Sequence, residues 1–545
     1  MSYADILIHG GRVFRGLHAG HAEAVAIHGN RIIAAGRHDA VAALAGPRTK
    51  RIDLAGRVAI PAFNDSHQHL LPLGLTMAQV NLRAEEVTTL GELLARIRAA
   101  AAKAAKGAWV VGRGYDHTML DVARHPTADE LQAAAPDNPV FITRACGHVG
   151  VANRAAFALT EIGHNTPDPE GGAFDRQGGQ LTGLVLERAM RKIRDRIPGP
   201  DHAALVDAIE RAGNHMTAQG FASVMDANVG MIAGMAEIDA YRAAHADGRL
   251  PVRTWLCLAG NPEGIADAAW DAGIRPMQGD DMLRFGAMKV FADGSVGGRT
   301  AAVTVPYENG AGQNEPNTGM FMFPPATLKS LLKKYHRQGW QLAIHAIGDA
   351  GIEVTLAGME EADSADFPVA GRRHRIEHCE FMAHGQTERM ATRGIEPVPQ
   401  AIFLYEFGDN YIATIGRARA HGCNPMRTWF NAGMHPAAGS DAPVSSTDPF
   451  RNIATSILRR TNRGTLIGAS EAITVEAAVH SYTWCGAYTQ FAEDRRGRIL
   501  PGQLADIAIL DRDIFAIPAH DIPATSADLT LRGGRPVFDR HGIFA

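Results

Sequence analysis

The most informative segment of the chain is Ile60-Pro61-Ala62-Phe63-Asn64-Asp65-Ser66-His67-Gln68-His69, an apolar strand that ends in a His-x-His pair. Side chains alternate between the two faces of a strand, so His67 and His69 point to the same side. Two neutral imidazoles at this spacing are ligands that a zinc-class cation accepts. Two solvated histidines in a loop would show the same local pattern, so this motif alone does not establish a metal site.

Four more ligand-type residues stand directly after separate apolar runs. They are Lys289 after Gly286–Met288, His345 after Leu342–Ile344, His378 after Arg373–Glu377 and Asp441 after Ala437–Ser440. Each one alone is also explained as a capping or surface residue. Polar side chains at the ends of several parallel strands are typical of a (β/α)₈ barrel enzyme, whose active site lies at the carboxyl ends of the strands.

The alternation of strand and helix candidates along the chain predicts one large α/β domain with additional segments. From about residue 58 to 490, apolar strand candidates alternate with helices, which favours a parallel sheet with helical crossovers. The candidates are Val58–Phe63, Ala222–Met225, Val252–Leu258, Phe285–Phe291, Gln341–Ile344 and Arg373–Ile376. Both chain ends show short strands among Gly and Pro instead, including a hairpin around His28-Gly29-Asn30-Arg31.

We therefore expect a (β/α)₈ TIM-like barrel with a small β-sandwich domain and an inserted α/β region. Residues 1–60 and 490–545 are expected to form one composite β-sandwich, and residues 61–75 and 206–489 the barrel. Residues 76–205 do not follow the strand–helix alternation and are expected to lie over the barrel mouth. Two separate β-modules at the chain ends would produce the same sequence pattern.

Composition favours an ordinary cytoplasmic enzyme with a small-molecule substrate. The chain has 545 residues and a net charge of −4, from 54 basic and 58 acidic residues, which gives no electrostatic case for nucleic acid or a membrane surface. No apolar run approaches the roughly 20 residues that span a bilayer, and the start lacks the features of a signal peptide. The 5 scattered cysteines favour a reducing compartment over a disulfide framework.

These motifs resemble the amidohydrolase superfamily, and within it the YtcJ-like branch (amidohydrolase family 3) that includes N-substituted formamide deformylases. The resemblance covers nearly the whole chain. It rests on Pro61–His69, Lys289–Gly294, His345–Asp349, Arg375–His378, Gly439–Asp441 and Gly502–Asp506, and on Gly112–Asp116 and Gly147–Asn153 in the inserted region.

The resemblance implies a site for two divalent metal ions. The implied ligands are His67, His69 and Asp441 for a more buried ion, and His345 and His378 for a more exposed one. Lys289 would be carboxylated by CO₂ and bridge both ions, because a bare ammonium between two dications would be strongly repelled. An unmodified Lys289 beside a single metal is the alternative. Zinc is the expected metal, although mixed nitrogen and oxygen ligands also accept manganese, cobalt or iron.

The implied reaction is hydrolysis of a linear, non-peptide amide C–N bond, in an N-substituted formamide or N-acyl amine, by a hydroxide shared between the metals. Asp441 is expected to take a proton from water and deliver it to the leaving amine. The other expected site residues are His148 and Tyr115 in catalysis, Asp116 and Arg299 at the substrate, and Asp293 and Asp349 as partners that orient Lys289 and His345. A packed loop position explains His148 equally well.

Other reactions stay open. Single-metal deaminases of the superfamily tend to carry Glu three residues after the fifth-strand histidine, where this chain has Gly348. A cyclic-amide hydrolase would also use a bridged metal pair. A binding or regulatory protein that has lost catalysis fits less well with the complete set of ligands. A homodimer is the commonest assembly for such enzymes.

Overall fold

A computed structural model describes residues 3–83, 86–144, 148–308 and 316–544. The chain divides into two compact units, one formed by Met1–Gly74 with Leu205–Ala545 and the other by Leu75–Ala204. Each unit has its own sheets and its own hydrophobic clusters. The fold is thus mixed α/β.

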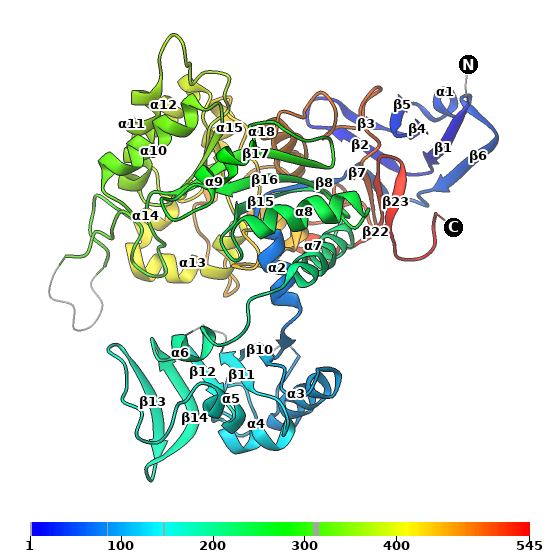
Figure 1. The fold of residues 1–545 in the computed structure, drawn as a ribbon. Helices are drawn as coiled ribbons and strands as arrows, with labels where there is room; N and C mark the ends of the chain where they lie inside the picture. The colour runs from blue at the N-terminus through cyan, green and yellow to red at the C-terminus, as the bar shows by residue number, and fades with distance from the viewer. Residues whose placement is uncertain (1–2, 84–85, 145–147, 309–315, 545) are drawn as a thin grey trace. The chain divides into compact units, whose positions relative to one another are not determined.

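The larger unit contains a seven-stranded parallel sheet that forms a nearly closed barrel (Figure 1). Its strands follow one another in chain order: β8 (Phe63–Gln68), β15 (Phe221–Val229), β16 (Arg253–Ala259), β17 (Leu283–Phe291), β18 (Gln341–Ala346), β19 (Arg375–His378) and β20 (Glu396–Val398). Nearly every residue of these strands is buried, as expected for parallel strands covered by helices outside and packed side chains inside. The predicted barrel is confirmed.

The extended segment 437–442 lies between β20 and β8 and takes the position of an eighth strand. On one side, the Gly439 N–H donates to the Pro399 carbonyl (3.1 Å). On the other, the Asp441 N–H donates to the His67 carbonyl (2.7 Å). These hydrogen bonds join the two edges of the sheet and hold Asp441 beside the end of β8.

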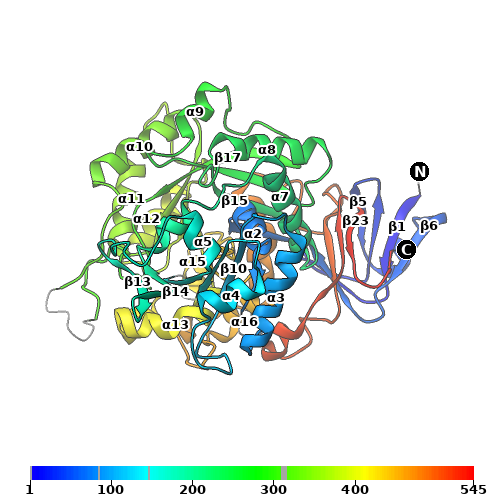
Figure 2. The same cartoon turned by 60° about the horizontal axis from the view of Figure 1, so that its bottom comes forward.

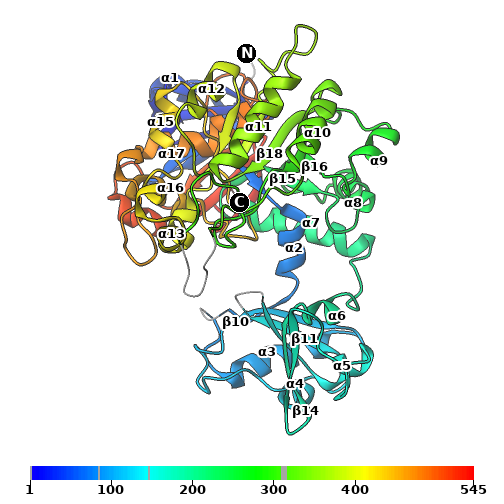
Figure 3. The ribbon, with the colours of Figure 1, turned by 90° about the vertical axis from the view of Figure 1, so that its left-hand side faces the viewer.

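Helices surround the barrel strands. They are α2 (Leu70–Met77), α7 (His202–Thr217), α8 (Met235–Ala246), α9 (Ala266–Asp271), α10 (Pro325–Arg337), α11 (Asp349–Ala362), α12 (Gln386–Arg393), α13 (Ile402–Ile415), α14 (Arg417–His421), α15 (Met426–Asn431), α16 (Pro449–Leu458), η1 (Ala469–Glu471), α17 (Val475–His480), the π-helical turn η2 (Ser481–Cys485) and α18 (Gly486–Thr489). In α10, Leu328, Leu332 and Tyr335 fall on one face and are buried. Figure 3 shows α10 and α11 beside β18, which both helices contact.

Both chain ends combine in one β-sandwich (Figure 2). One sheet has the order β5 (Arg31–Gly36), β4 (Ala24–His28), β1 (Ala4–His9), β6 (Ala45–Asp53), and the other β23 (Arg535–Asp539), β22 (Ala527–Arg532), β21 (Ile507–Leu510), β7 (Val58–Pro61), β2 (Arg12–Gly16), β3 (Gly20–Ala22). The short helices α1 (His38–Ala42) and η3 (Ala519–Ala524) belong to the same terminal segments. Ile8 and Ile27 share one buried cluster with Ile507 and Leu529, so the two termini form a single core.

One strand prediction was wrong in its extent. We predicted a single barrel strand over Val58–Phe63, but β7 ends at Pro61 and pairs with β2 and β21 in the sandwich, whereas β8 begins at Phe63. Ala62 lies between them and donates its N–H to the Asp506 carbonyl (3.0 Å). Both strands are buried, so hydropathy does not reveal which sheet each one joins.

The smaller unit has a six-stranded sheet with helices. The strand order is β13 (Gly172–Gln177), β14 (Gln180–Glu187), β12 (Val149–Ala152), β11 (Val140–Arg144), β10 (Val110–Tyr115), β9 (Val80–Asn81), and the helices are α3 (Leu90–Lys103), α4 (Ala128–Ala134), α5 (Arg154–Leu159) and α6 (Met190–Arg194). A capping box of Thr89 and Glu92 begins α3. Gly178 and Gly179, both with positive φ, form the β13–β14 turn.

The cysteines carry no disulfide among the described residues. Cys257, Cys379, Cys423 and Cys485 are free and buried. Cys146 lies outside the described residues. Within the described part of the chain, no helix combines the length and the apolar character that a bilayer crossing requires.

Candidate metal centre

The six side chains predicted to bind metal meet at the carboxyl ends of the barrel strands. They are His67, His69, Lys289, His345, His378 and Asp441. His67 Nε2 lies 3.2 Å from Lys289 Nζ and 3.4 Å from Asp441 Oδ1. The same Asp441 oxygen lies 3.2 Å from His69 Nε2. Asp441 therefore lies next to both members of the His-x-His pair.

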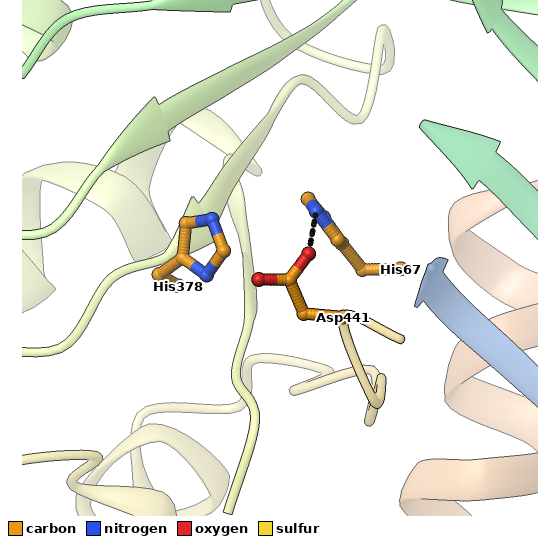
Figure 4. A group of neighbouring side chains, drawn as sticks. All are labelled: His67, His378 and Asp441. Carbon is orange, nitrogen blue, oxygen red and sulfur yellow. Dashed lines mark ion pairs between the residues drawn. The ribbon is translucent and has the colours of Figure 1, made fainter. Parts of the chain in front are cut away.

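The two later histidines complete the cluster. Figure 4 shows the Asp441 carboxylate between the rings of His67 and His378, and one ligand atom from each of the three lies within 4.8 Å of the others. The His378 ring is also 4.4 Å from the ring of His345. His378 (φ +69) and Asp441 (φ +57) both adopt left-handed backbone conformations, which non-glycine residues seldom hold.

The His-x-His imidazoles are each anchored through Nδ1. His67 Nδ1 donates to the Glu377 carboxylate, and both side chains are fully buried. His69 Nδ1 donates to the Ala227 carbonyl (2.6 Å). A metal binds an imidazole through a nitrogen that carries no proton, and these anchors leave Nε2 of each ring as the nitrogen open to a metal.

The other two imidazoles are anchored in the same manner. His345 Nε2 donates to the Gly294 carbonyl (2.9 Å), which leaves Nδ1 with the lone pair. His378 Nδ1 donates to Gln400 Oε1 (2.7 Å), which leaves Nε2 with it. All four histidines thus give one nitrogen to a protein oxygen and keep one ligand nitrogen.

Burial keeps His345 and His378 neutral. Burial, with the nearby Lys289 as a further cause, lowers the pKa of His345 to about 3. Burial and then the neighbouring His345 lower the pKa of His378 well below its ordinary value. At neutral pH both rings are therefore uncharged, as a metal ligand must be.

Lys289 and Asp441 have shifted pKa values for different reasons. Burial lowers the pKa of Lys289, although the Glu377 carboxylate opposes this shift. Burial disfavours the ionised form of Asp441, but the side chains of His67 and His69 outweigh it and hold the pKa of Asp441 well below its ordinary value. The centre thus contains an ionised carboxylate and a lysine amine whose pKa is lowered by burial.

Sequence reasoning missed three residues that support the ligands. The Arg375 Nε donates to Glu377 Oε1 (2.5 Å) and Nη2 donates to the Ser66 carbonyl (2.5 Å), so Arg375 holds the carboxylate that anchors His67. The alternation of Arg375 and Glu377 on one strand was a usable signal, since both face the same side. Gln400 follows a different strand from His378, and no local pattern identifies it.

Asp65 was also missed, although it stands inside the quoted motif. Its carboxylate accepts from the N–H groups of His67 (3.2 Å) and Ser440 (3.0 Å). Burial raises the pKa of Asp65 to about 7 despite these hydrogen bonds. Asp65 thus ties β8 to the segment that carries Asp441.

Asp293 was expected, together with Asp349, to orient Lys289 and His345. Its carboxylate accepts from the Gly348 N–H (2.9 Å) and lies 3.7 Å from Nε2 of His345, one of those two residues. It therefore fixes the loop that follows His345. The contact between Asp293 and the loop after His345 forms because the tertiary structure brings the end of β17 next to the end of β18.

Asp349, the other residue expected to orient Lys289 and His345, contacts Thr304, and its role at these two residues stays a prediction. Its carboxylate accepts from the backbone N–H (2.9 Å) and the hydroxyl of Thr304. Asp349 is the first residue of α11, and its side chain holds the loop that contains Thr304.

Arg299 and His148, predicted for substrate binding and catalysis, lie in loop or exposed positions. Arg299 has a left-handed backbone (φ +54), and its carbonyl accepts from Asn317 Nδ2 (3.0 Å). His148, in the smaller unit, is exposed, and its Nδ1 donates to Glu187 (2.9 Å). Their roles at a substrate stay predictions.

Tyr115 and Asp116 also belong to the smaller unit. Tyr115 is fully buried in its hydrophobic core, with the hydroxyl 3.0 Å from His125 Nδ1. Asp116 accepts two hydrogen bonds from Arg144 Nη2, at 2.9 and 3.1 Å. Within this unit both side chains are engaged in local structure, and their predicted catalytic and substrate roles stay predictions.

Comparisons with known proteins agree with this arrangement. The sequence matches the family described as "Amidohydrolase family" over residues 50–538. It is similar to "Putative amidohydrolase YtcJ" of Bacillus subtilis, with 29% identity over 98% of this chain and 99% of that protein. It is also similar to the N-substituted formamide deformylase of Arthrobacter pascens, with 29% identity over 90% of each chain.

A solved structure shows the same fold. The crystal structure of an uncharacterized metal-dependent hydrolase from Pyrococcus furiosus is similar with a TM-score of 0.76 and 27% sequence identity, over 94% of this chain and 99% of that one. The family match covers most of the sequence and includes every candidate ligand. The chain therefore belongs to the amidohydrolase family, as its motifs predicted.

Proposed function

We propose that this protein is a metal-dependent hydrolase that cleaves a linear, non-peptide amide C–N bond in an N-substituted formamide or N-acyl amine. The observation that carries the proposal is the common anchoring of four imidazoles, three of them buried, around one ionised carboxylate, Asp441. The similarity to an N-substituted formamide deformylase supports the substrate class.

The residues present fit a pair of divalent cations. His67, His69 and Asp441 would hold one ion, and His345 and His378 the other. Neutral imidazole nitrogens with a carboxylate oxygen form a donor set that suits zinc, the metal we propose. The anchored second nitrogen of each ring fixes its orientation, which is the usual support for histidine ligands.

Lys289 fits the role of a carboxylated bridging ligand. Burial favours its neutral amine, the form whose nitrogen can bond to the carbon of CO₂ while releasing one proton. Its Nζ already reaches within 3.2 Å of the His67 ligand nitrogen. The product, an anionic carbamate, would replace a cation that two metal ions would repel.

Asp441 provides the proton transfer. When bound, the metals would lower the pKa of water and polarise the substrate carbonyl. Asp441 is ionised, so it can accept a proton from the water whose oxygen bonds to the carbonyl carbon. It then delivers that proton to the nitrogen as the C–N bond breaks, which yields a free amine and a carboxylic acid.

One structural feature disfavours the deaminase alternative. A side chain at Gly348 would place its Cβ 2.0 Å from the Ala302 carbonyl oxygen. The glutamate that single-metal deaminases tend to carry at this position therefore has no room here. Amide hydrolysis needs no acid at this position, because Asp441 moves the proton.

The experiment measures metal content and intact mass on protein purified without chelator. We expect two metals per chain and a mass excess of one CO₂ that a Lys289→Arg variant lacks, because arginine keeps the positive charge but forms no such carbamate. Release of amine is then screened with N-substituted formamides and N-acyl amines, against cyclic amides and aminated heterocycles.

Each part of the proposal has its own contrary result. One metal, no mass excess and ammonia release from a heterocycle would establish a deaminase. Ring opening of cyclic amides without cleavage of linear ones would show that the substrates are cyclic amides and not the linear amides proposed. No metal uptake on addition of zinc would exclude hydrolysis through this centre.

A further inference from the structure

Strand β8 passes directly into helix α2, and this junction gives His69 two competing tasks. The His69 carbonyl accepts from the Leu73 N–H (2.8 Å), the first hydrogen bond of α2, so His69 is the N-cap residue of that helix. An N-cap side chain usually accepts from an N–H of the first helical turn. The His69 ring instead donates through Nδ1 to the Ala227 carbonyl (2.6 Å) and turns Nε2 toward Asp441 (3.2 Å). The candidate ligand therefore does not cap its own helix.

Asp226, on the neighbouring strand β15, caps α2 in its place. Its Oδ2 accepts from the Leu71 N–H (3.1 Å), which belongs to the first turn of the helix. That first turn contains no acidic residue of its own. Because N–H groups at the start of a helix have no partner within the helix, a side chain from another element has to accept from them. A strand residue thus takes over a task that the His69 ring leaves undone.

The Asp226 carboxylate is itself held from outside the barrel. Met225 and Ala227, on either side of Asp226, belong to a buried cluster to which strands β15 to β18 all contribute inside the barrel. Side chains alternate along a strand, so Asp226 points outward to the helices. There the hydroxyl of Tyr241, a fully buried residue of α8, donates to the same Oδ2 atom. Tyr241 therefore fixes the carboxylate that caps α2.

Asp226 also stands where the pairing of β8 with β15 ends. The register shifts between Val224 and Asp226, and the last pair is Asp226 with Gln68. Irregular pairing of this kind is common next to active sites, where it aims a side chain. Beyond the last pair, the segments are joined by the His69 ring on the Ala227 carbonyl and by the Leu71 N–H on Asp226. The position of His69 thus depends on contacts with this end of β15.

We propose that Asp226, held by Tyr241, is a positioning residue that sets the place of His69 in the metal centre. Asp226 points away from the barrel interior, so it acts through the first turn of α2 and not by contact with a metal ion. Loss of the cap frees that turn, and Nε2 of His69 then no longer matches the geometry of the other ligands. The inference rests on the proposed function, in that His69 binds metal, but not on any particular substrate.

Cobalt(II) binding tests the proposal, because the absorption spectrum of the bound ion reports the geometry of its ligands and a purely structural role leaves that spectrum unchanged. We expect Asp226→Ala to bind cobalt about 10–100-fold more weakly than wild type and with an altered spectrum. Asp226→Asn keeps an oxygen for the Leu71 N–H and should restore both. In the matched control Glu237→Ala, the lost carboxylate accepts from the N–H groups of Gly230 (2.7 Å) and Ile232 (2.6 Å), in a loop without candidate ligands. This variant should lose stability and keep the wild-type spectrum.

The outcomes separate this inference from the proposed function. Wild-type affinity and spectrum in Asp226→Ala would overturn the inference and leave the metal centre in place. The same spectral change in Asp226→Ala and Glu237→Ala would also overturn it, because general destabilisation would then be the cause. Absence of cobalt binding in the wild type would overturn the inference and the proposed function together.

A milder variant decides the question if Asp226→Ala does not fold. Tyr241→Phe removes only the hydroxyl that holds Asp226. We expect cobalt affinity to fall by less than about ten-fold, since one hydrogen bond is lost, together with a change in the spectrum. Tyr307→Phe is its control, because the Tyr307 hydroxyl is also buried and donates to the Ala301 carbonyl (2.8 Å), which is not part of a candidate ligand. Identical spectra for the two tyrosine variants and the wild type would contradict the proposal.

Discussion

The two ends of β19 carry buried histidines with different hydrogen-bond patterns. At the carboxyl end, His378 gives Nδ1 to Gln400 and keeps Nε2 for the candidate metal centre. Just before the amino end, His374 uses both nitrogens within the protein: Nδ1 accepts from the Leu342 N–H (3.0 Å), and Nε2 donates to His336 Nδ1 (2.8 Å). Both histidines are buried, so burial alone does not separate them.

The difference shows how a ligand is distinguished from a structural histidine. Like His374, His336 uses both nitrogens within the protein: Nδ1 accepts from His374, and Nε2 donates to the Phe367 carbonyl (2.9 Å). The pair has no nitrogen left for a metal. This division agrees with the general rule for barrels, in which the carboxyl ends of the strands carry chemistry and the amino ends carry stability.

The largest expected effect is at the catalytic end. Asp441→Asn keeps the shape of the side chain but removes the ionised proton acceptor, so we expect kcat to fall by about 10²–10⁴-fold. Steady-state amine release measures it, with bound metal quantified in the same sample. His374→Gln, at the other end of β19, is the control and should retain full metal content. A kcat within ten-fold of wild type for Asp441→Asn would remove Asp441 from the proton transfer.

A smaller effect should follow from removing the hydrogen-bond acceptor of one histidine. Gln400→Leu removes the acceptor that fixes His378, and we expect metal affinity to fall by about 10–100-fold. Gln400→Glu keeps an acceptor oxygen and should bind metal close to wild type. Competition with a chromogenic chelator measures both. Equal affinities for Leu and Glu at this position would mean that the anchor does not position the ring.

The hydrogen-bonded pair of His336 and His374 should show its role in the pH dependence of stability. Burial and then His336 lower the pKa of His374 well below its ordinary value of 6.5, so the folded protein keeps it neutral while the unfolded chain takes up a proton. Its contribution to the free energy of unfolding is complete above about pH 6.5 and is lost as the pH falls through that value, by up to about 1.4 kcal/mol per pH unit.

Denaturant titrations of wild type and His374→Gln, roughly one unit above and one below that pH, isolate this contribution. Glutamine can accept from Leu342 and donate to His336 but does not titrate, so its stability should fall less on acidification. Identical pH dependence in the two proteins would assign the acid sensitivity to other groups.

The smallest effect distinguishes the two roles considered for Asp349. If it only holds Thr304, Asp349→Asn should lower the free energy of unfolding by about 1 kcal/mol and leave metal affinity unchanged. Thr304→Val should cost a similar amount, and the double variant little more, since both remove one contact. Loss of metal in Asp349→Asn would support the role predicted from sequence, in which Asp349 helps to orient Lys289 and His345.

Much of the candidate centre was predictable because its proposed ligands are chemically distinctive residues at strand ends. His67 and His69 share a face by strand periodicity, and Lys289 ends a run that hydropathy identifies. Gln400 was not predictable, because a neutral amide after β20 shows no local pattern. The division of Val58–Phe63 between two sheets was missed for a related reason: buried strands look alike in sequence whichever sheet they join.

By itself, the sequence determined the parallel α/β alternation, the family and the set of candidate metal ligands, because these follow from local periodicity and residue chemistry. Only the tertiary structure decided how the barrel closes through segment 437–442 and which nitrogen of each histidine is engaged. Those features depend on hydrogen bonds between distant parts of the chain. The bond between His67 and Glu377, for example, joins residues 310 positions apart, and no local pattern specifies such a contact.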